Sequence, residues 1–172
     1  MDYLQNRNLL EEIEAIGLKV TWTLILLGFK EYDSFQIGLS SGDLIEYVKK
    51  RIDEDNRMQE QFIELICVEN DFFKISDLVA KYSAKEKNSK GFEMRKWRVL
   101  KMIHLLNESD TSSSLFITSV YDFLLSYSSI LPPPFFYTND IVSFFNRAPK
   151  TVFEDCNRWL TSEIDEIKSL DV

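Results

Sequence analysis

The chain has 172 residues, a formal net charge of −8 and a hydrophobic content of 45%. With 13% aromatic residues, this composition excludes a disordered chain, and the length suits one domain with a proper core. The 5 glycines and 4 prolines are too few for a turn-rich β-sandwich. The longest apolar run, residues 20–29, is too short to span a bilayer, so we expect no membrane partner.

Two features of the sequence bear on the cellular compartment. Residues 1–12 lack the basic and apolar regions of a secretory signal, which predicts a cytoplasmic protein. Cys67 and Cys156 lie far apart in the chain, so we expect two reduced thiols in the core and no disulfide.

Apolar residues recur at helical spacing along nearly the whole chain, which predicts an all-α protein. Asn8 and Glu11 resemble a capping box at the start of the first helix, Gly17 suits its end, and Thr21 suits the cap of the second. An extended piece is expected at residues 35–39. The predicted helices cover residues 8–16, 21–27, 41–54, 56–66, 76–82, 92–108, 115–127, 139–145 and 151–167.

The helix predicted over residues 92–108 is apolar on almost every side. Val99 and Ile103 share one face, and Trp97 lies on a neighbouring stripe. A helix that is apolar all round is usually central and packed from several directions. We therefore predict a single all-α domain over residues 1–172, an irregular array of about eight helices around this central one.

Several segments interrupt the helical pattern in the second half of the chain. Residues 85–90, KEKNSK, are the most polar stretch and are expected to form a mobile loop. Residues 128–137 contain three consecutive prolines, which cannot continue a helix and favour an extended segment. Pro149 is expected to close the short helix that follows, and Thr151 with Glu154 resembles a capping box for the last helix.

No catalytic or metal motif stands out. His104 is the only histidine, and a general base or metal ligand needs an orienting partner, so a structural role is favoured. Asp53, Glu54 and Asp55 resemble part of a hard-cation site, but the central glycine of an EF-hand loop is absent. These carboxylates form either a solvated helix end or an acidic patch for a basic partner. We expect no cofactor, no metal and no enzymatic activity.

One basic stretch stands out in an acidic chain. Residues 81–101 carry 8 Lys or Arg against 2 Asp or Glu, whereas residues 1–80 carry 8 against 16 and residues 102–172 carry 4 against 10. One interpretation of the basic stretch is a phosphate-binding face. Because an acidic protein repels nucleic acid, we favour a solvated rim whose cations pair with the protein's own carboxylates, and we expect no nucleic-acid partner.

Phe135, Phe136 and Tyr137 follow the three prolines. One interpretation makes them anchors for a partner, because aromatic residues dominate binding hot spots. The other tucks them under the helices as a lid on the core, and it is favoured because an exposed apolar patch is a solubility liability.

Several aromatic and apolar positions resemble a family of small bacterial proteins that is classed as a domain of unknown function. The resemblance spans residues 18–149 and rests on the following positions: Leu18 to Trp22 (LKVTW), Gly28-Phe29, Ser41 to Ile45 (SGDLI), Lys96-Trp97, Leu100, Leu105, Leu106, Phe135 to Tyr137, Ile141, Phe144 and Pro149. It implies a small acidic cytosolic protein of the kind found in toxin–immunity neighbourhoods, where such proteins bind and block a toxin domain.

These observations predict a non-enzymatic protein-binding module, an immunity-type protein that binds and blocks a bacterial toxin. The expected partner is a protein, for example a basic toxin domain. The candidate contacts are Asp53, Glu54, Asp55, Phe135, Phe136 and Tyr137. Two alternatives stay open: a small-ligand-binding protein or enzyme with a site between helices near His104, and nucleic-acid binding through residues 81–101.

Overall fold

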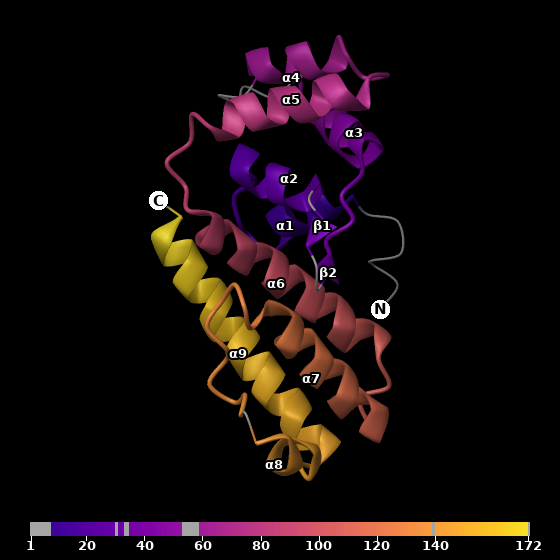
Figure 1. The fold of residues 1–172 in the computed structure, drawn as a ribbon, viewed down its shortest axis with the longest axis vertical. Helices are drawn as coiled ribbons and strands as arrows, with labels where there is room; N and C mark the ends of the chain where they lie inside the picture. Colours follow the sequence, from indigo (N-terminus) through magenta and orange to yellow (C-terminus); the bar gives the residue numbers. More distant parts are fainter. Residues whose placement is uncertain (1–7, 30, 33–34, 53–58, 139, 172) are drawn as a thin grey trace. The chain divides into compact units, whose positions relative to one another are not determined.

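The computed structural model describes residues 8–29, 31–32, 35–52, 59–138 and 140–171 (Figure 1). Within these residues the protein is all-α, as predicted, with nine helices and one short antiparallel strand pair. The strands pair Glu31 with Gln36 and Tyr32 with Phe35. The elements are α1 Leu9–Ala15, α2 Trp22–Phe29, β1 Glu31–Tyr32, β2 Phe35–Gln36, α3 Ser41–Arg51, α4 Gln59–Ile66, α5 Phe72–Ser83, α6 Lys90–Glu108, α7 Ser114–Tyr127, α8 Ile141–Phe145 and α9 Pro149–Leu170.

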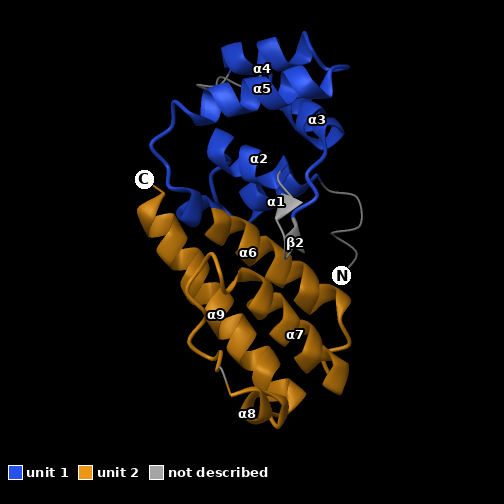
Figure 2. Cartoon of the chain, in the orientation of Figure 1, with its two compact units in different colours: residues 1–93 blue, residues 94–172 orange. Residues whose placement is uncertain are grey.

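The chain divides into two compact units, residues 1–93 and residues 94–172 (Figure 2). Unit 1 holds α1 to α5 and the strand pair, and unit 2 holds α7 to α9. The boundary falls within α6, most of which belongs to unit 2. The single-domain organisation of residues 1–172 stays a prediction.

The core of unit 1 gathers aromatic side chains from four helices. Helix α2 packs against α5, and α3 packs against α1 and α4. The ring of Trp22 lies 5.9 Å from that of Phe62 in an edge-on contact and 4.8 Å from that of Tyr82. Tyr47 contacts Phe62 at a ring distance of 6.3 Å. Such aromatic pairs stabilise a core beyond the area that they bury.

The first helix begins and ends near the predicted residues. The Asn8 side chain accepts a hydrogen bond from the Leu10 amide at 3.0 Å and caps α1. Glu11, which the sequence predicts as its capping partner, forms an ion pair with Lys50 at 2.9 Å. Gly17 has a φ of 81°, which is the left-handed conformation expected just after a helix end.

The amide groups in the first turn of α2 donate to the predicted cap and to a carboxylate that is distant in sequence. Thr21 accepts a hydrogen bond from the Leu24 amide at 3.0 Å, as expected of an N-cap. Glu86 accepts from the Trp22 amide at 2.9 Å, from the Thr23 amide at 2.7 Å and from the Thr23 hydroxyl at 2.8 Å. The polar segment that the sequence predicts to be a mobile loop is therefore tied to α2 through Glu86.

We expect Glu86→Ala to lower the free energy of unfolding by about 2 kcal/mol, because two helix-end amides lose their acceptor. Lys87→Ala is the control, since this exposed neighbour should change stability by less than about 0.5 kcal/mol. Urea denaturation followed by tryptophan fluorescence measures both variants. Equal stability of the two would contradict the capping role of Glu86.

In unit 2, α7 packs against both α8 and α9 (Figure 1). Phe116 of α7 meets Phe153 of α9 with ring centroids 6.3 Å apart. Ion pairs join α6 to α9. Much of the apolar surface that predicts a central helix over residues 92–108 is buried, including Met94, Trp97, Val99, Leu100 and Met102.

Helix α9 begins at Pro149, which makes two predictions wrong. Ala148 is the N-cap, and proline suits the first helical position because its fixed φ fits a helix and its missing amide needs no partner there. Pro149 therefore opens α9 and does not close the preceding helix. The predicted cap, Thr151, lies inside α9, and Glu154 forms a 4.0 Å ion pair with Lys150.

The two cysteines are free and differ in their surroundings. Cys156 is buried, as predicted, and burial, helped by the charge of Asp155, raises the pKa of its thiol to about 12. Cys67 is exposed, so its predicted place in the core is wrong.

Candidate functional site

The predicted partner contacts fall into two groups. Asp53, Glu54 and Asp55 lie outside the described residues. The three aromatic residues after the prolines differ in exposure: Phe135 is 62% exposed, Phe136 is buried and Tyr137 is half-buried. Phe136 is therefore buried, as the second interpretation predicts, whereas Phe135 reaches solvent and its role as a partner anchor stays a prediction.

The proline-rich segment is held by its carbonyl groups. Proline has no amide N–H to donate, so backbone hydrogen bonds can hold such a segment only through its carbonyl acceptors and its non-proline amides. Arg98 Nη1 donates to the Pro132 carbonyl at 2.7 Å, and Arg147 Nη1 donates to the Phe136 carbonyl at 3.3 Å. The amide of Tyr137 donates to the Pro134 carbonyl at 3.0 Å.

Three aromatic rings pack together and form what we call the aromatic base: Tyr121 of α7, Tyr137 of the proline segment (residues 128–137) and Phe144 of α8. The ring of Tyr121 stacks on that of Tyr137 at 5.9 Å and lies 5.3 Å from that of Phe144. Tyr121 also contacts the ring of Phe145 at 5.3 Å. Phe144 is completely buried, whereas Phe145 reaches the surface. These ring contacts join α7, the proline segment and α8.

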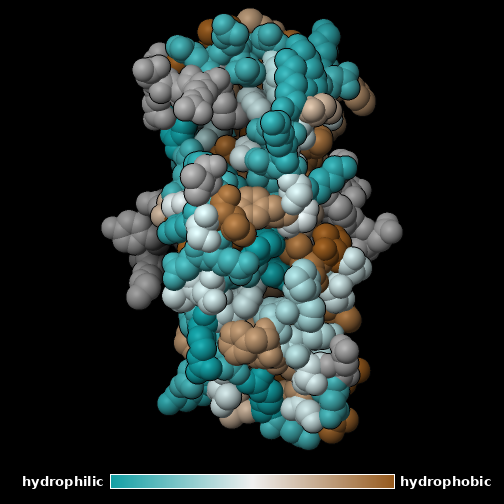
Figure 3. Space-filling model, turned by 90° about the vertical axis from the view of Figure 1, so that its left-hand side faces the viewer, coloured by the Kyte–Doolittle hydropathy of each residue, from teal (hydrophilic) through white to brown (hydrophobic). Residues whose placement is uncertain are grey.

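Large apolar side chains are exposed above this base. Val142 is 69% exposed, and its α8 neighbours Ile141 and Phe145 are exposed as well. On α7, Leu125 is exposed one turn after Tyr121. On the face drawn in Figure 3, hydrophilic side chains cover much of the surface and hydrophobic ones reach it in separate patches. We call Leu125, Ile141, Val142 and Phe145 the α7–α8 face.

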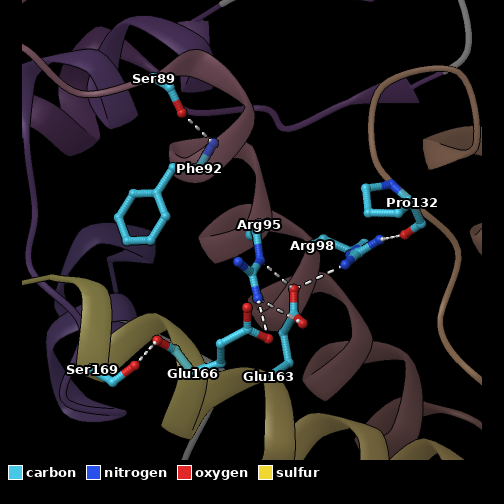
Figure 4. Close-up of polar contacts among 8 residues, drawn as sticks. All are labelled: Ser89, Phe92, Arg95, Arg98, Pro132, Glu163, Glu166 and Ser169. Carbon is cyan, nitrogen blue, oxygen red and sulfur yellow. Dashed lines mark hydrogen bonds and ion pairs between the residues drawn. The ribbon is translucent and has the colours of Figure 1, made fainter.

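A second cluster in unit 2 is ionic and uses the predicted basic stretch (Figure 4). Arg95 Nε donates to Glu163 Oε1 at 2.8 Å, and Arg98 Nη2 donates to the same oxygen at 2.9 Å. Lys96 Nζ lies 2.9 Å from Asp171 Oδ2. The prediction that these cations pair with the protein's own carboxylates is confirmed for all three.

The prediction of a solvated rim is wrong for two of these cations. Lys96 is completely buried and Arg98 is 3% exposed. Arg98 also lies over the ring of Trp159 at 5.0 Å, which adds a cation–π contact. Burying these charges is tolerable because each has a carboxylate within hydrogen-bonding distance, which offsets part of the cost of removing it from water.

The charge of Glu163 holds the cluster together. Burial alone would raise the pKa of the Glu163 carboxyl, but the hydrogen bonds and charges of Arg95 and Arg98 outweigh burial and place this pKa below the usual 4.5. Burial lowers the pKa of Arg98, which Glu163 opposes, and the guanidinium stays protonated at neutral pH.

Glu163 is the residue of this cluster that sequence reasoning misses. It lies three residues after Leu160 and four before Ile167, both of which are buried on α9. Helical spacing therefore places it on the buried stripe. A carboxylate at such a position is rarely buried without a partner, and this signal could have identified it.

The alternative of a small-ligand or catalytic site near His104 stays a prediction. His104 is half-buried on α6. No group of three or more His, Cys, Asp or Glu in the described part of the chain is arranged to hold a metal ion. A surface cavity of about 420 Å³ is lined by Thr111, Ser112, Ala148, Pro149, Lys150 and Phe153.

Within the described ranges, no helix combines the length and apolar character needed to cross a membrane.

Comparison with known proteins bears on the family of the chain. No curated protein and no solved structure matches it. The sequence model of the family described as "Uncharacterized protein conserved in bacteria" (DUF2247) matches residues 10–164. This match confirms the resemblance to a bacterial family of unknown function. Because it covers most of the chain, the protein belongs to the DUF2247 family.

Proposed function

We propose that the protein is a non-enzymatic protein-binding module, an immunity-type protein that binds and blocks a bacterial toxin. One observation carries the protein-binding part of this proposal: exposed apolar side chains stand on a packed aromatic base. Phe135 and Val142 are each more than half exposed, while Phe144 of α8 is completely buried. Such a patch costs solubility unless a partner covers it, and aromatic anchors are typical of binding hot spots.

Blocking a toxin requires occlusion of its active face and no chemical step. A surface held in place before binding loses little conformational entropy on association, which favours tight complexes. The net charge of −8 would speed the approach of a basic toxin domain and make the association rate sensitive to salt.

The nucleic-acid alternative keeps four exposed cations, Lys81, Lys85, Lys87 and Lys90, and is weakened at three others. A phosphate-binding face needs cations that reach solvent. Lys96 and Arg98 are buried, and Arg95 is paired with Glu163 and Glu166 at 2.8 and 2.9 Å.

Deleting the gene in its native bacterium should arrest growth if a cognate toxin is made there, and inactivating the adjacent toxin-like gene should restore growth. The intact chain supplied in trans should protect the cells. Phe135→Ser should weaken protection, because Phe135 is an exposed anchor. Phe73→Ser, at a position 79% exposed in unit 1, is the matched control and should protect fully.

Two results together would contradict the proposal. They are unimpaired growth of the deletion strain and no complex between the chain and the product of the adjacent gene.

A further inference from the structure

Residues 109–146, which form α7, the proline segment and α8, contain no Lys, Arg or His. Their charged residues are Asp110, Asp122 and Asp140, all of them exposed. The chain as a whole carries 20 Lys and Arg, so this cation-free stretch is a local property and not a consequence of composition.

The α7–α8 face lies on this stretch, and Tyr121 links its two helices. Tyr121 packs against Phe145 of α8, and Leu125 lies one helical turn beyond Tyr121 on the same side of α7. In α8, Ile141 and Phe145 are four residues apart and Val142 lies beside them, so these exposed side chains share one side of the helix.

Carboxylates border this apolar face. Asp122 lies on α7 three residues before Leu125, and Asp140 caps α8 by accepting a hydrogen bond from the Ser143 amide at 3.3 Å. Two arginines donate hydrogen bonds to the proline segment, and each also pairs with a carboxylate: Arg98 with Glu163, and Arg147 with Asp155.

We propose that the α7–α8 face binds a basic amphipathic helix of a partner protein, with apolar side chains on one side and Lys or Arg at its margins. The proposal rests on the proposed protein-binding function and specifies its partner chemistry. Apolar contact with Val142 and its neighbours supplies affinity, and Asp122 and Asp140 receive the cations and set the orientation.

The charge pattern disfavours other occupants. A second copy of the same face would bring Asp122 and Asp140 toward their own counterparts with no cation between them, and like charges across an interface are repulsive. An anionic lipid surface or a nucleic acid would meet the same carboxylates.

The test uses a fluorescent synthetic amphipathic peptide with leucines on one side and lysines on the other, titrated with the full chain at low and high salt. A twin peptide with glutamates in place of the lysines is the charge control. We expect the lysine peptide to bind and the glutamate peptide not to bind. Val142→Asp should weaken binding of the lysine peptide about tenfold, because it removes an apolar contact. Its added negative charge alone would favour a basic peptide.

Phe73→Asp is the matched variant, since it adds the same carboxylate at an exposed apolar position of unit 1, and it should leave binding unchanged. The double variant Asp122→Asn, Asp140→Asn should weaken binding about threefold and flatten its salt dependence. Asparagine retains the capping ability of Asp140, so α8 should stay folded, which circular dichroism checks.

Equal weakening by Val142→Asp and Phe73→Asp would overturn the proposal, as would binding of the glutamate peptide or of anionic phosphatidylserine vesicles. A dimer in sedimentation that Val142→Asp dissociates would assign the face to a second copy and overturn it too. Full protection of cells by Val142→Asp would refute this face while leaving the proposed function intact. Peptide binding as expected, without protection by the intact chain, would refute the immunity role alone.

Discussion

Glu163→Gln should lower the free energy of unfolding of unit 2 by about 3 kcal/mol, because removing one partner of a buried ion pair leaves the other charge uncompensated. Glu163 is the shared acceptor of Arg95 and Arg98, and Arg98 has almost no access to water. Urea denaturation followed by tryptophan fluorescence measures the loss, since two of the three tryptophans, Trp97 and Trp159, lie in this unit. Trp159 is the more sensitive probe, since Arg98 lies over its ring.

Glu166→Gln is the matched control for this prediction. Glu166 also pairs with Arg95, at 2.9 Å, but its side chain is exposed. Exposed ion pairs contribute about 0–1 kcal/mol, so the control should unfold nearly as the unaltered protein does. If the two variants lost the same stability, the contribution of these ion pairs to stability would not depend on their burial.

The stability of the unaltered protein should also fall in acid in a way that Glu163→Gln removes. The pKa of Glu163 is lower in the folded state than its ordinary value of 4.5. The carboxylate therefore contributes stability that is fully present above pH 4.5 and is lost as the pH falls through the lower folded pKa. The difference in stability between the two proteins should shrink over that range.

Phe144→Ala should lower the free energy of unfolding by about 3–4 kcal/mol, because truncating a buried phenylalanine loses its transfer energy and leaves a cavity. Phe144 is completely buried and contacts Tyr121 at 5.3 Å and Tyr137 at 6.4 Å. The same variant should weaken partner binding, since α8 loses the base that positions Val142. Thermal unfolding and peptide titration measure the two effects separately.

Phe145→Ala is the control with the same chemistry at the next position. Phe145 is exposed, so its truncation should cost about 1 kcal/mol or less in stability. Its effect should therefore fall on binding more than on folding. A larger loss of stability in Phe145→Ala than in Phe144→Ala would mean that α8 presents its opposite side to the core.

Sequence patterns predict the helices well where the groups that interact are close in sequence. Thr21 caps α2 because its hydroxyl reaches an amide within the same turn, and the apolar spacing around Trp97 predicts a buried helix. The start of α9 is predicted wrongly because Thr151 and Pro149 both carry a start signal. Proline at the first helical position extends the helix beyond the threonine.

The candidate site is predicted only in outline. Phe135 and Phe136 are adjacent residues of one type, and no local pattern indicates which of them reaches solvent. Their exposure is set by the carbonyl groups on either side, which Arg98 holds at Pro132 and Arg147 holds at Phe136. Both arginines belong to other segments of the chain, so this outcome requires the folded unit.

The sequence by itself determined that the protein is all-α, where most helices run, and that residues 109–146 present carboxylates and no cation. Only the tertiary structure decided that Lys96 and Arg98 lie inside while Val142 lies outside. The physical reason is distance along the chain. Burying a charged lysine or arginine is costly unless a carboxylate comes within hydrogen-bonding distance. Glu163, 65 residues after Arg98, meets it only when α9 packs beside α6.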